Sequence, residues 1–345
     1  MIPFSVLDLV PIRKGGDAAQ AFAAMREQAR HAEKLGYHRY WLAEHHNMAG
    51  VACSATSVLI GQVADATRTI RVGSGGVMLP NHAPLIIAEQ FGTLASLFPG
   101  RIDLGLGRAP GTDPQTAHAL RRTREGNDRD FPQDVLELQA YFEEPQVHQA
   151  VRAIPGAGLR VPIWLLGSSL FSAQLAAMLG LPYAFASHFA PDYLMDALHA
   201  YRTGFKPSVY LDRPHAMVGI NVVAANSDAE AHYLFSSQQI QSINMMRGKR
   251  EALPPPISDM NGFCDPREKA SLDHKLTYAF VGSEETILEK LEPFIAQTEA
   301  DEIITTVRIF DPEACLRSLE ILAGVRARLP VSEDRTSEPI GTLVP

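Results

Sequence analysis

Cysteine is scarce in this chain of 345 residues, and long apolar runs are missing. The three cysteines, Cys53, Cys264 and Cys315, form no CxxC pair, which argues against a disulfide framework and a zinc-ribbon site. No apolar run approaches the ~20 residues that cross a bilayer. The first residues lack a basic segment followed by an apolar one, so we expect no signal peptide and a reduced, cytoplasmic protein.

Basic residues are also sparse and do not cluster. Charged residues make up 20% of the chain, the formal net charge is -8, and basic runs such as Arg121-Arg122 stop at two residues. We expect no nucleic-acid partner, because such proteins present basic patches or stripes. Hydrophobic residues make up 46% of the chain, which is ample for a sizeable core.

Segments of strand character alternate with segments of helical periodicity along most of the sequence. We expect strands at 4–9, 37–43, 70–79, 101–107, 162–166, 183–186, 216–224, 277–281 and 302–309. Helices are expected at 17–35, 54–67, 84–98, 131–142, 169–179, 191–203, 228–247, 284–296 and 313–328. Such alternation implies right-handed crossovers and a parallel sheet. It favours an α/β fold of the (β/α)8 TIM-barrel type, with a doubly wound sheet as the alternative.

A (β/α)8 barrel occupies ~250 residues, so the surplus length predicts insertions. The candidates are 110–130, which is polar and reads as a loop, 146–160, which reads as a short β excursion, and the irregular, proline-rich segment 250–276. No composition break marks a linker. We therefore predict one domain over 1–330 and a loose C-terminal tail over 331–345.

Two adjacent glycines, Gly75 and Gly76, interrupt an apolar, β-branched segment. Glycine weakens a strand interior, because it has no side chain to pack and loses much backbone freedom on ordering. Such a strand end leaves room for a strained backbone or for a ligand. Polar and glycine residues close neighbouring strands as well, at 44–47, 105–108 and 167–169, which indicates a barrel with an active-site face.

The segment 105–111 (GLGRAPG) fits a dinucleotide-binding fingerprint poorly, because Pro110 stands where a glycine or alanine should open the helix. Strand alternation puts Gly105 and Gly107 on one face, and we expect this face to line the barrel and leave a cavity near its mouth. Arg108 then lies at the rim, where it suits an anion; the alternative is a surface arginine after a turn.

Serines surround the start of the helix expected at 169–179, namely Ser168, Ser169 and Ser172. Free N–H groups and the dipole at a helix N terminus bind phosphate, and serine hydroxyls add donors. The alternative is a plain N-cap by Ser168 or Ser169. Arg108 on the same barrel face favours phosphate.

The run Glu44-His45-His46-Asn47 ends the second strand and allows three interpretations. It is a metal site, an acid or base beside a cofactor, or a loop with hydrogen-bonded histidines. Alternation sends Glu44 and His46 to one face and His45 to the other, so three metal ligands from this run are awkward. His82 and His188 also follow strand ends. Met245 and Met246 are expected on a helix face or in the core.

Several motifs then occur in order along the chain: 41–47 (WLAEHHN), 72–84 (VGSGGVMLPNHAP), 99–108 (PGRIDLGLGR), 162–169 (PIWLLGSS) and 281–285 (VGSEE). With these motifs the sequence resembles the bacterial luciferase-like, flavin-dependent monooxygenases over about residues 4 to 328. The resemblance implies a (β/α)8 barrel that binds reduced FMN at the carboxyl ends of its strands. The reduced flavin would react with O2 to give a flavin hydroperoxide, which oxygenates a small organic substrate. A separate flavin reductase would supply the flavin, and a homodimer would form through early helices.

The resemblance also assigns roles to residues. It implies a cis peptide between Gly75 and Gly76 beneath the flavin ring, with Gly107 facing the flavin in place of a cysteine of luciferase. That replacement indicates the non-luminescent branch. Phosphate positions fall to Arg108, Ser168, Ser169 and Ser172, with Arg129 as a further contact. His45 takes the catalytic role, with Glu44 beside the flavin.

Three other functions remain open from the sequence. A deazaflavin-dependent dehydrogenase would use the same barrel. A metal-dependent hydrolase would use His45, His46 and His188, although our expected site holds no metal. A flavin-binding protein without turnover is the third. The segment 250–276 is our candidate for a lid over the mouth.

Overall fold

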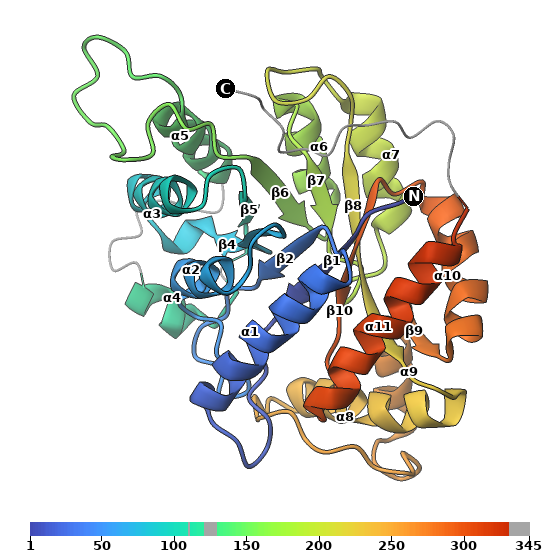
Figure 1. Cartoon of the computed structure of the whole chain (residues 1–345). Coiled ribbons are helices and arrows are strands. Elements are labelled where there is room, and N and C mark those ends of the chain that lie inside the picture. The colour runs from blue at the N-terminus through green and yellow to red at the C-terminus, as the bar shows by residue number, and fades with distance from the viewer. Residues whose placement is uncertain (110, 121–129, 331–345) are drawn as a thin grey trace.

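The computed structural model describes residues 1–109, 111–120 and 130–330. Within them, parallel strands form a closed wall of eight positions that helices surround (Figure 1). Strand β10 (Glu302–Thr306) pairs with both β1 (Phe4–Asp8) and β8 (Ala216–Ala224), which closes the circle. From β1 to β8 the other positions are β2 (Arg39–Leu42), β3 (Arg71–Ser74) with β4 (Val77–Met78), β5 (Ile102–Gly107), β6 (Ile163–Gly167) and β7 (Tyr183–Phe185). The predicted (β/α)8 barrel is confirmed, and the doubly wound alternative is wrong, because an open sheet would leave two free edges.

Helices connect successive strands on the outside of the barrel (Figure 1). They are α1 (Ala18–Lys34), α2 (Thr56–Ala66), α3 (Pro84–Leu97), α4 (Pro114–Leu120), α5 (Phe131–Phe142), α6 (Leu170–Leu179), α7 (Leu194–Gly204), α8 (Asp228–Met246), α9 (Pro266–Lys275), α10 (Glu284–Thr298) and α11 (Pro312–Arg328). Local signals explain their ends. Asp17 and Gln20 form a capping box before α1, and Gly36, with φ of 72°, follows its end. No helix among the described residues is long and apolar enough to cross a membrane.

The structure corrects two predicted strands. The segment 70–79 is not one strand, because the backbone leaves the sheet at Gly75 and Gly76 and returns as β4, after which a short 3-10 turn (Leu79–Asn81) begins. The strand expected at 277–281 exists as β9 (Ala279–Gly282), but within the described ranges it pairs only with the end of β8 and lies outside the eight-position wall.

The insertions differ from expectation as well. The described residues of 146–160 contain turns and no strand, so the predicted β excursion is wrong. The segment 250–276 is not irregular throughout, because Asp265 and Glu268 form a capping box that starts α9. Helix α4 lies in the predicted loop 110–130. Residue 110, residues 121–129 including Arg129, and the tail 331–345 lie outside the described residues.

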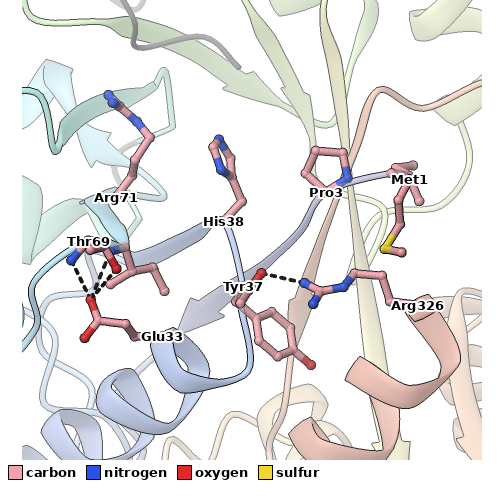
Figure 2. Close-up of a pocket in the computed structure, with 11 residues that line it drawn as sticks. Met1, Pro3, Glu33, Tyr37, His38, Thr69, Arg71 and Arg326 are labelled. Carbon is pink, nitrogen blue, oxygen red and sulfur yellow. Dashed lines mark hydrogen bonds between the residues drawn. The ribbon is translucent and has the colours of Figure 1, made fainter. Parts of the chain in front are cut away.

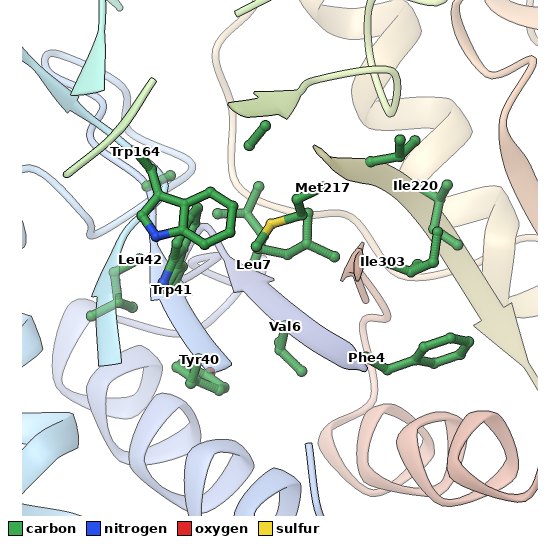
Figure 3. Packing of buried hydrophobic residues seen from close by; sticks show 14 of the residues in the cluster. Phe4, Val6, Leu7, Tyr40, Trp41, Leu42, Trp164, Met217, Ile220 and Ile303 are labelled. Atoms are coloured by element: carbon green, nitrogen blue, oxygen red, sulfur yellow. The ribbon is translucent and has the colours of Figure 1, made fainter. Parts of the chain in front are cut away.

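Two tryptophans lie next to each other among the buried hydrophobic residues (Figure 3). Trp41 on β2 and Trp164 on β6 are fully buried and meet edge to face, with ring centroids 5.2 Å apart. The guanidinium of Arg39 lies 4.8 Å from the Trp164 ring centroid. Arg39 begins β2, so this contact marks the transition from the aromatic layer to charged residues at the amino ends of the strands.

These charged residues form what we call the floor network: Arg39, Arg71, Asp103 and Glu302. One Nη of Arg39 lies 2.6 Å from a carboxylate oxygen of Asp103, and its Nε lies 3.1 Å from Glu302. Arg71 approaches the other Asp103 oxygen at 2.5 Å. Burial alone would raise the pKa of Asp103, but Arg39 and Arg71 hold that pKa below its usual value. The floor is therefore a set of paired charges.

Candidate active site

A cavity of about 360 Å³ opens at the carboxyl ends of the barrel strands. Its lining includes these residues singled out by the sequence: His45, Gly75, Gly76, Gly107, Arg108, Ser168, Ser169, Ser172 and His188. They come from the ends of five separate strands, and closure of the barrel brings them to one mouth. That end of a (β/α)8 barrel is where active sites lie.

Two glycine positions explain how the cavity keeps its space. The Gly75–Gly76 peptide is cis, as the resemblance implied, and lies on the cavity wall. A Cβ added to Gly107 would lie 2.8 Å from the sulfur of Met78, another lining residue. Side chains at these positions would therefore crowd the groups that shape the cavity.

Gly105 has a different function from the one expected. A Cβ there would lie 2.2 Å from the backbone oxygen of Ser74 on the neighbouring strand, and Gly105 does not line the cavity. The prediction that both glycines of β5 open the mouth is wrong for Gly105. This glycine instead allows β3 and β5 to approach closely, with the Ser74 hydroxyl donating to its carbonyl at 2.8 Å.

The start of α6 carries groups that could hold an anion. Ser169 is the N-cap residue, but its side chain makes no capping hydrogen bond. The hydroxyl of Ser172 donates to the Ser169 carbonyl at 3.4 Å. The guanidinium carbon of Arg108 lies 4.2 Å from the ring centroid of Phe171, in the first turn of the helix. Arg108 is thus held beside N–H groups that the helix itself leaves unsatisfied.

His45 and Glu44 face opposite ways, as strand alternation predicted. His45 lines the cavity, and its Nδ1 lies 3.3 Å from the carbonyl oxygen of Gly111. Burial lowers the pKa of His45, so the ring is neutral at pH 7. With Nδ1–H donating to that carbonyl, Nε2 is left as the proton acceptor.

Glu44, expected beside the flavin, is buried and does not line the cavity. Its carboxylate accepts hydrogen bonds from His46 at 2.9 Å, from His82 at 2.8 Å and from the Met78 N–H at 3.2 Å. Burial alone would raise the pKa of Glu44, but hydrogen bonds from the two histidines lower it to about 2. Glu44 therefore fixes the backbone that follows the glycine pair.

Metal-binding geometry occurs in one place among the described residues. The ligand atoms of Glu44, His46 and His82 lie within 4.8 Å of one another. The histidines of the hydrolase alternative do not converge, because His46 turns toward Glu44 whereas His45 and His188 line the cavity.

His188 is buried at the mouth in an unusual state. Its Nδ1 has no hydrogen-bond partner among the described residues, and it lies so close to Gly219 that a Cβ there would be 2.6 Å away. The side-chain amide of Asn221 on β8 donates to the His188 carbonyl at 2.6 Å and fixes this backbone. Burial, followed by the nearby cations Arg308 and Lys275, lowers the pKa of His188 to about 3. Its imidazole is therefore neutral at physiological pH.

Sequence reasoning missed several lining residues. Arg308 follows β10 by two residues, as Arg108 follows β5, so a charged residue at a strand end was a usable signal. Phe189 and Lys275 gave no such signal. Met245, expected on a helix face or in the core, lines the cavity from the end of α8. Phe189, Lys275 and Met245 lie on segments whose orientation only the tertiary structure defines.

The insertion 250–276 reaches the same end of the barrel. The Leu253 N–H donates to the Ile12 carbonyl at 2.8 Å, and Arg250 lies 3.3 Å from Asp113. Lys275, at the end of α9, lines the cavity. These contacts agree with a position over the mouth, and the lid remains a prediction.

A second, open hollow of about 410 Å³ lies at the opposite end, among residues that precede β1, β2 and β3 (Figure 2). Its charged side chains Glu33 and Arg326 make hydrogen bonds within the chain. One carboxylate oxygen of Glu33 accepts the backbone N–H groups of Arg68, Thr69 and Ile70 at 2.6–3.0 Å. Arg326 donates to the Gly36 carbonyl at 2.6 Å. These contacts join helices to strands. The cavity at the carboxyl ends is therefore the better candidate for an active site.

Known proteins resemble this chain over most of its length. A family model described as luciferase-like monooxygenase matches residues 2–302. A luciferase-like monooxygenase of Escherichia coli (strain K12) is 54% identical over 328 residues, which cover 95% of this chain and 98% of that protein. An N-acetyl-S-alkylcysteine monooxygenase of Bacillus subtilis (strain 168) is 42% identical over 190 residues, which cover 54% of this chain and 57% of that protein.

Solved structures with a similar fold are also known. Apo-MsnO8 is 33% identical, with a TM-score of 0.85 over 96% of this chain and 100% of that one. The oxygenating constituent of 3,6-diketocamphane monooxygenase from Pseudomonas putida, in complex with FMN, is 19% identical, with a TM-score of 0.72 over 96% and 99%. An F420-dependent secondary alcohol dehydrogenase with an F420-acetone adduct is 15% identical, with a TM-score of 0.63 over 94% and 98%. At 19% and 15% identity, the last two structures show similarity to this chain in fold alone.

Proposed function

Because this chain belongs to the luciferase-like monooxygenase family, we propose that it is a monooxygenase that uses reduced FMN and O2 to oxygenate a small organic substrate. The observation that carries the proposal is the wall of the mouth cavity. Arg108, stacked on Phe171, lies beside the uncapped start of α6, and the same cavity is lined by the glycine pair Gly75–Gly76.

The residues of the cavity fit FMN chemically. Arg108, Ser168, Ser169 and Ser172 offer a cation, hydroxyls and helix N–H groups, which is the donor set that a phosphate prefers. No aspartate or glutamate is among the described lining residues, so nothing there repels a dianion. Gly75, Gly76 and Gly107 keep side chains away from the wall where we propose that the flavin ring binds.

FMN, when bound, would supply the chemistry with O2, and the protein would bind, orient and exclude water. We propose that His45 is the catalytic group and that it exchanges a proton at Nε2. Glu44 would act through the backbone of Met78, which it holds, rather than by touching the flavin. Trp41, Leu7 and Leu166 supply the apolar wall that keeps water out.

Equilibrium binding distinguishes the cofactors. Purified protein should bind reduced FMN saturably and F420 weakly, and substrate-dependent O2 consumption should follow when reduced FMN is supplied. Saturable F420 binding without FMN binding would make the chain a deazaflavin-dependent dehydrogenase. FMN binding without O2 consumption across a broad substrate panel would make it a flavin-binding protein without turnover. The panel should begin with N-acetyl-S-alkylcysteines, after which one relative is named.

A flavin reductase and a homodimer complete the proposal. Large apolar side chains are exposed on the early helices, namely Val58 on α2 and Ile86 and Leu97 on α3, and they support dimerisation there. Light scattering should give the mass of two chains, and Leu97→Glu should give one. A wild-type protein that stays monomeric at all concentrations would contradict this part.

A further inference from the structure

A second group of cations lies in the mouth, away from the proposed phosphate site. Arg308 follows β10, whereas Arg108 follows β5. In the closed wall β5 and β10 are four positions apart in either direction, so the two arginines approach the cavity from opposite sides. A single phosphate at the start of α6 cannot occupy both.

Arg308 has no counter-charge in the described part of the chain. No carboxylate or carbonyl there accepts a hydrogen bond from its guanidinium, and its Nε is buried without a partner. Burial lowers the pKa of Arg308 to about 10, which still leaves it charged at pH 7. A buried donor on a charged group is costly when it has no partner, and an anionic ligand in the cavity would supply the missing acceptor.

Lys275 reinforces this side of the cavity. It closes α9, lines the same cavity and makes no ion pair in the described residues. Burial and the nearby positive charge of Arg308 lower the pKa of Lys275, which places the two cations within electrostatic range of each other. The neutral His188 lies in the same group, and its ring packs edge to face on Phe189 with centroids 4.8 Å apart. The group thus combines positive charge with an aromatic surface.

We propose that Arg308 and Lys275 form an anion subsite that binds a carboxylate or sulfonate of the organic substrate. The substrate of the proposed monooxygenase, on which this inference rests, is then a small organic anion with an apolar body against Phe189 and Met245. Arg308 offers a planar fork of donors that matches both acid groups, and Lys275 adds a point charge. The alternative is that Arg308 and Lys275 bind the polar edge of the flavin ring. The experiment below distinguishes substrate binding from flavin binding.

The test uses protein saturated with oxidised FMN and two probes of matched shape, benzoate and benzamide, with binding measured by calorimetry. Wild type should bind benzoate at least about tenfold more tightly than benzamide. Arg308→Gln and Lys275→Gln should each weaken benzoate binding several-fold, Arg308→Lys should restore part of it, and FMN affinity should change less than about threefold. Arg317→Gln, which removes an exposed arginine, is the charge-matched control.

Two results would overturn the proposal. One is equal binding, or no binding, of benzoate and benzamide. The other is an Arg308→Gln protein that loses FMN affinity by about tenfold or more, because the arginine would then serve the flavin. Titration of wild type with FMN alone tests the cofactor assignment separately, and benzoate titration of flavin-free protein shows whether the subsite exists without it.

Discussion

The two ends of this barrel handle buried charge in opposite ways. At the amino ends of the strands, Arg39 and Arg71 are paired with Asp103 and Glu302 at 2.5–3.1 Å. At the carboxyl ends, the Nε of Arg308 is buried with no partner in the described chain. The charges of the floor network are satisfied by the chain itself, so they serve the fold. Arg308 at the mouth has no such partner in the described chain, and we propose that a ligand supplies one.

The largest effect should follow from breaking the floor network. Arg39→Met leaves Asp103 and Glu302 buried without their shared cation, and it should lower the free energy of unfolding by about 3–5 kcal/mol. Urea denaturation measures this loss. Arg317→Met, which removes an exposed ion pair with Glu320, should cost less than about 1 kcal/mol. Equal losses in both variants would contradict the assigned role of the floor.

Substitution of a cation at the mouth should weaken ligand binding. Arg108→Ala should weaken FMN binding by about 1.5–3 kcal/mol, which is roughly ten- to a hundredfold, because a charged hydrogen-bond partner of the phosphate is lost. Riboflavin lacks the phosphate, and its affinity should stay within a factor of about two. Quenching of flavin fluorescence measures both. A parallel loss for riboflavin would mean that Arg108 contacts another part of the flavin.

The two glycines of β5 allow the same comparison, of fold against binding, within one strand. Gly105→Ala forces a Cβ to within 2.2 Å of the Ser74 oxygen, a backbone atom, and should destabilise the protein by about 1–3 kcal/mol. Gly107→Ala meets only the flexible thioether of Met78 at 2.8 Å, so stability should change less while FMN affinity falls. Thermal unfolding measures the stability of both variants, and flavin titration measures their FMN affinity. The reverse order of stabilities would refute the assignment.

The sequence predicted the barrel well, because most of its strands and helices show their own hydrophobic periodicity, and some helices, such as α1, also carry a capping residue. It also predicted that the glycine pair Gly75–Gly76, Gly107 and the serines at the start of α6 reach the mouth, since these stand at strand ends. It could not separate Gly105 from Gly107, because the contact with Ser74 depends on how β3 and β5 approach each other. Nor could it detect Lys275, which reaches the cavity only because α9 turns back to the barrel mouth.

The last predicted effect is a pH dependence at the mouth, which is confined to acidic solution. The pKa of His188 is about 3 in the folded protein and about 6.5 in an unfolded chain. Stability from the neutral ring is therefore full above pH 6.5 and is lost as the pH falls toward 3, because the unfolded chain takes up the proton first. His188→Gln should flatten the stability profile in this window relative to wild type. Unchanged profiles would show that His188 titrates normally.

A crystal structure of the protein with FMN tests the central claim most directly. We expect the phosphate within hydrogen-bond distance of Arg108 and the start of α6, the flavin ring against the Gly75–Gly76 peptide, and Arg308 free of the phosphate. A phosphate bound by Arg308, or a flavin bound outside the mouth cavity, would contradict the account.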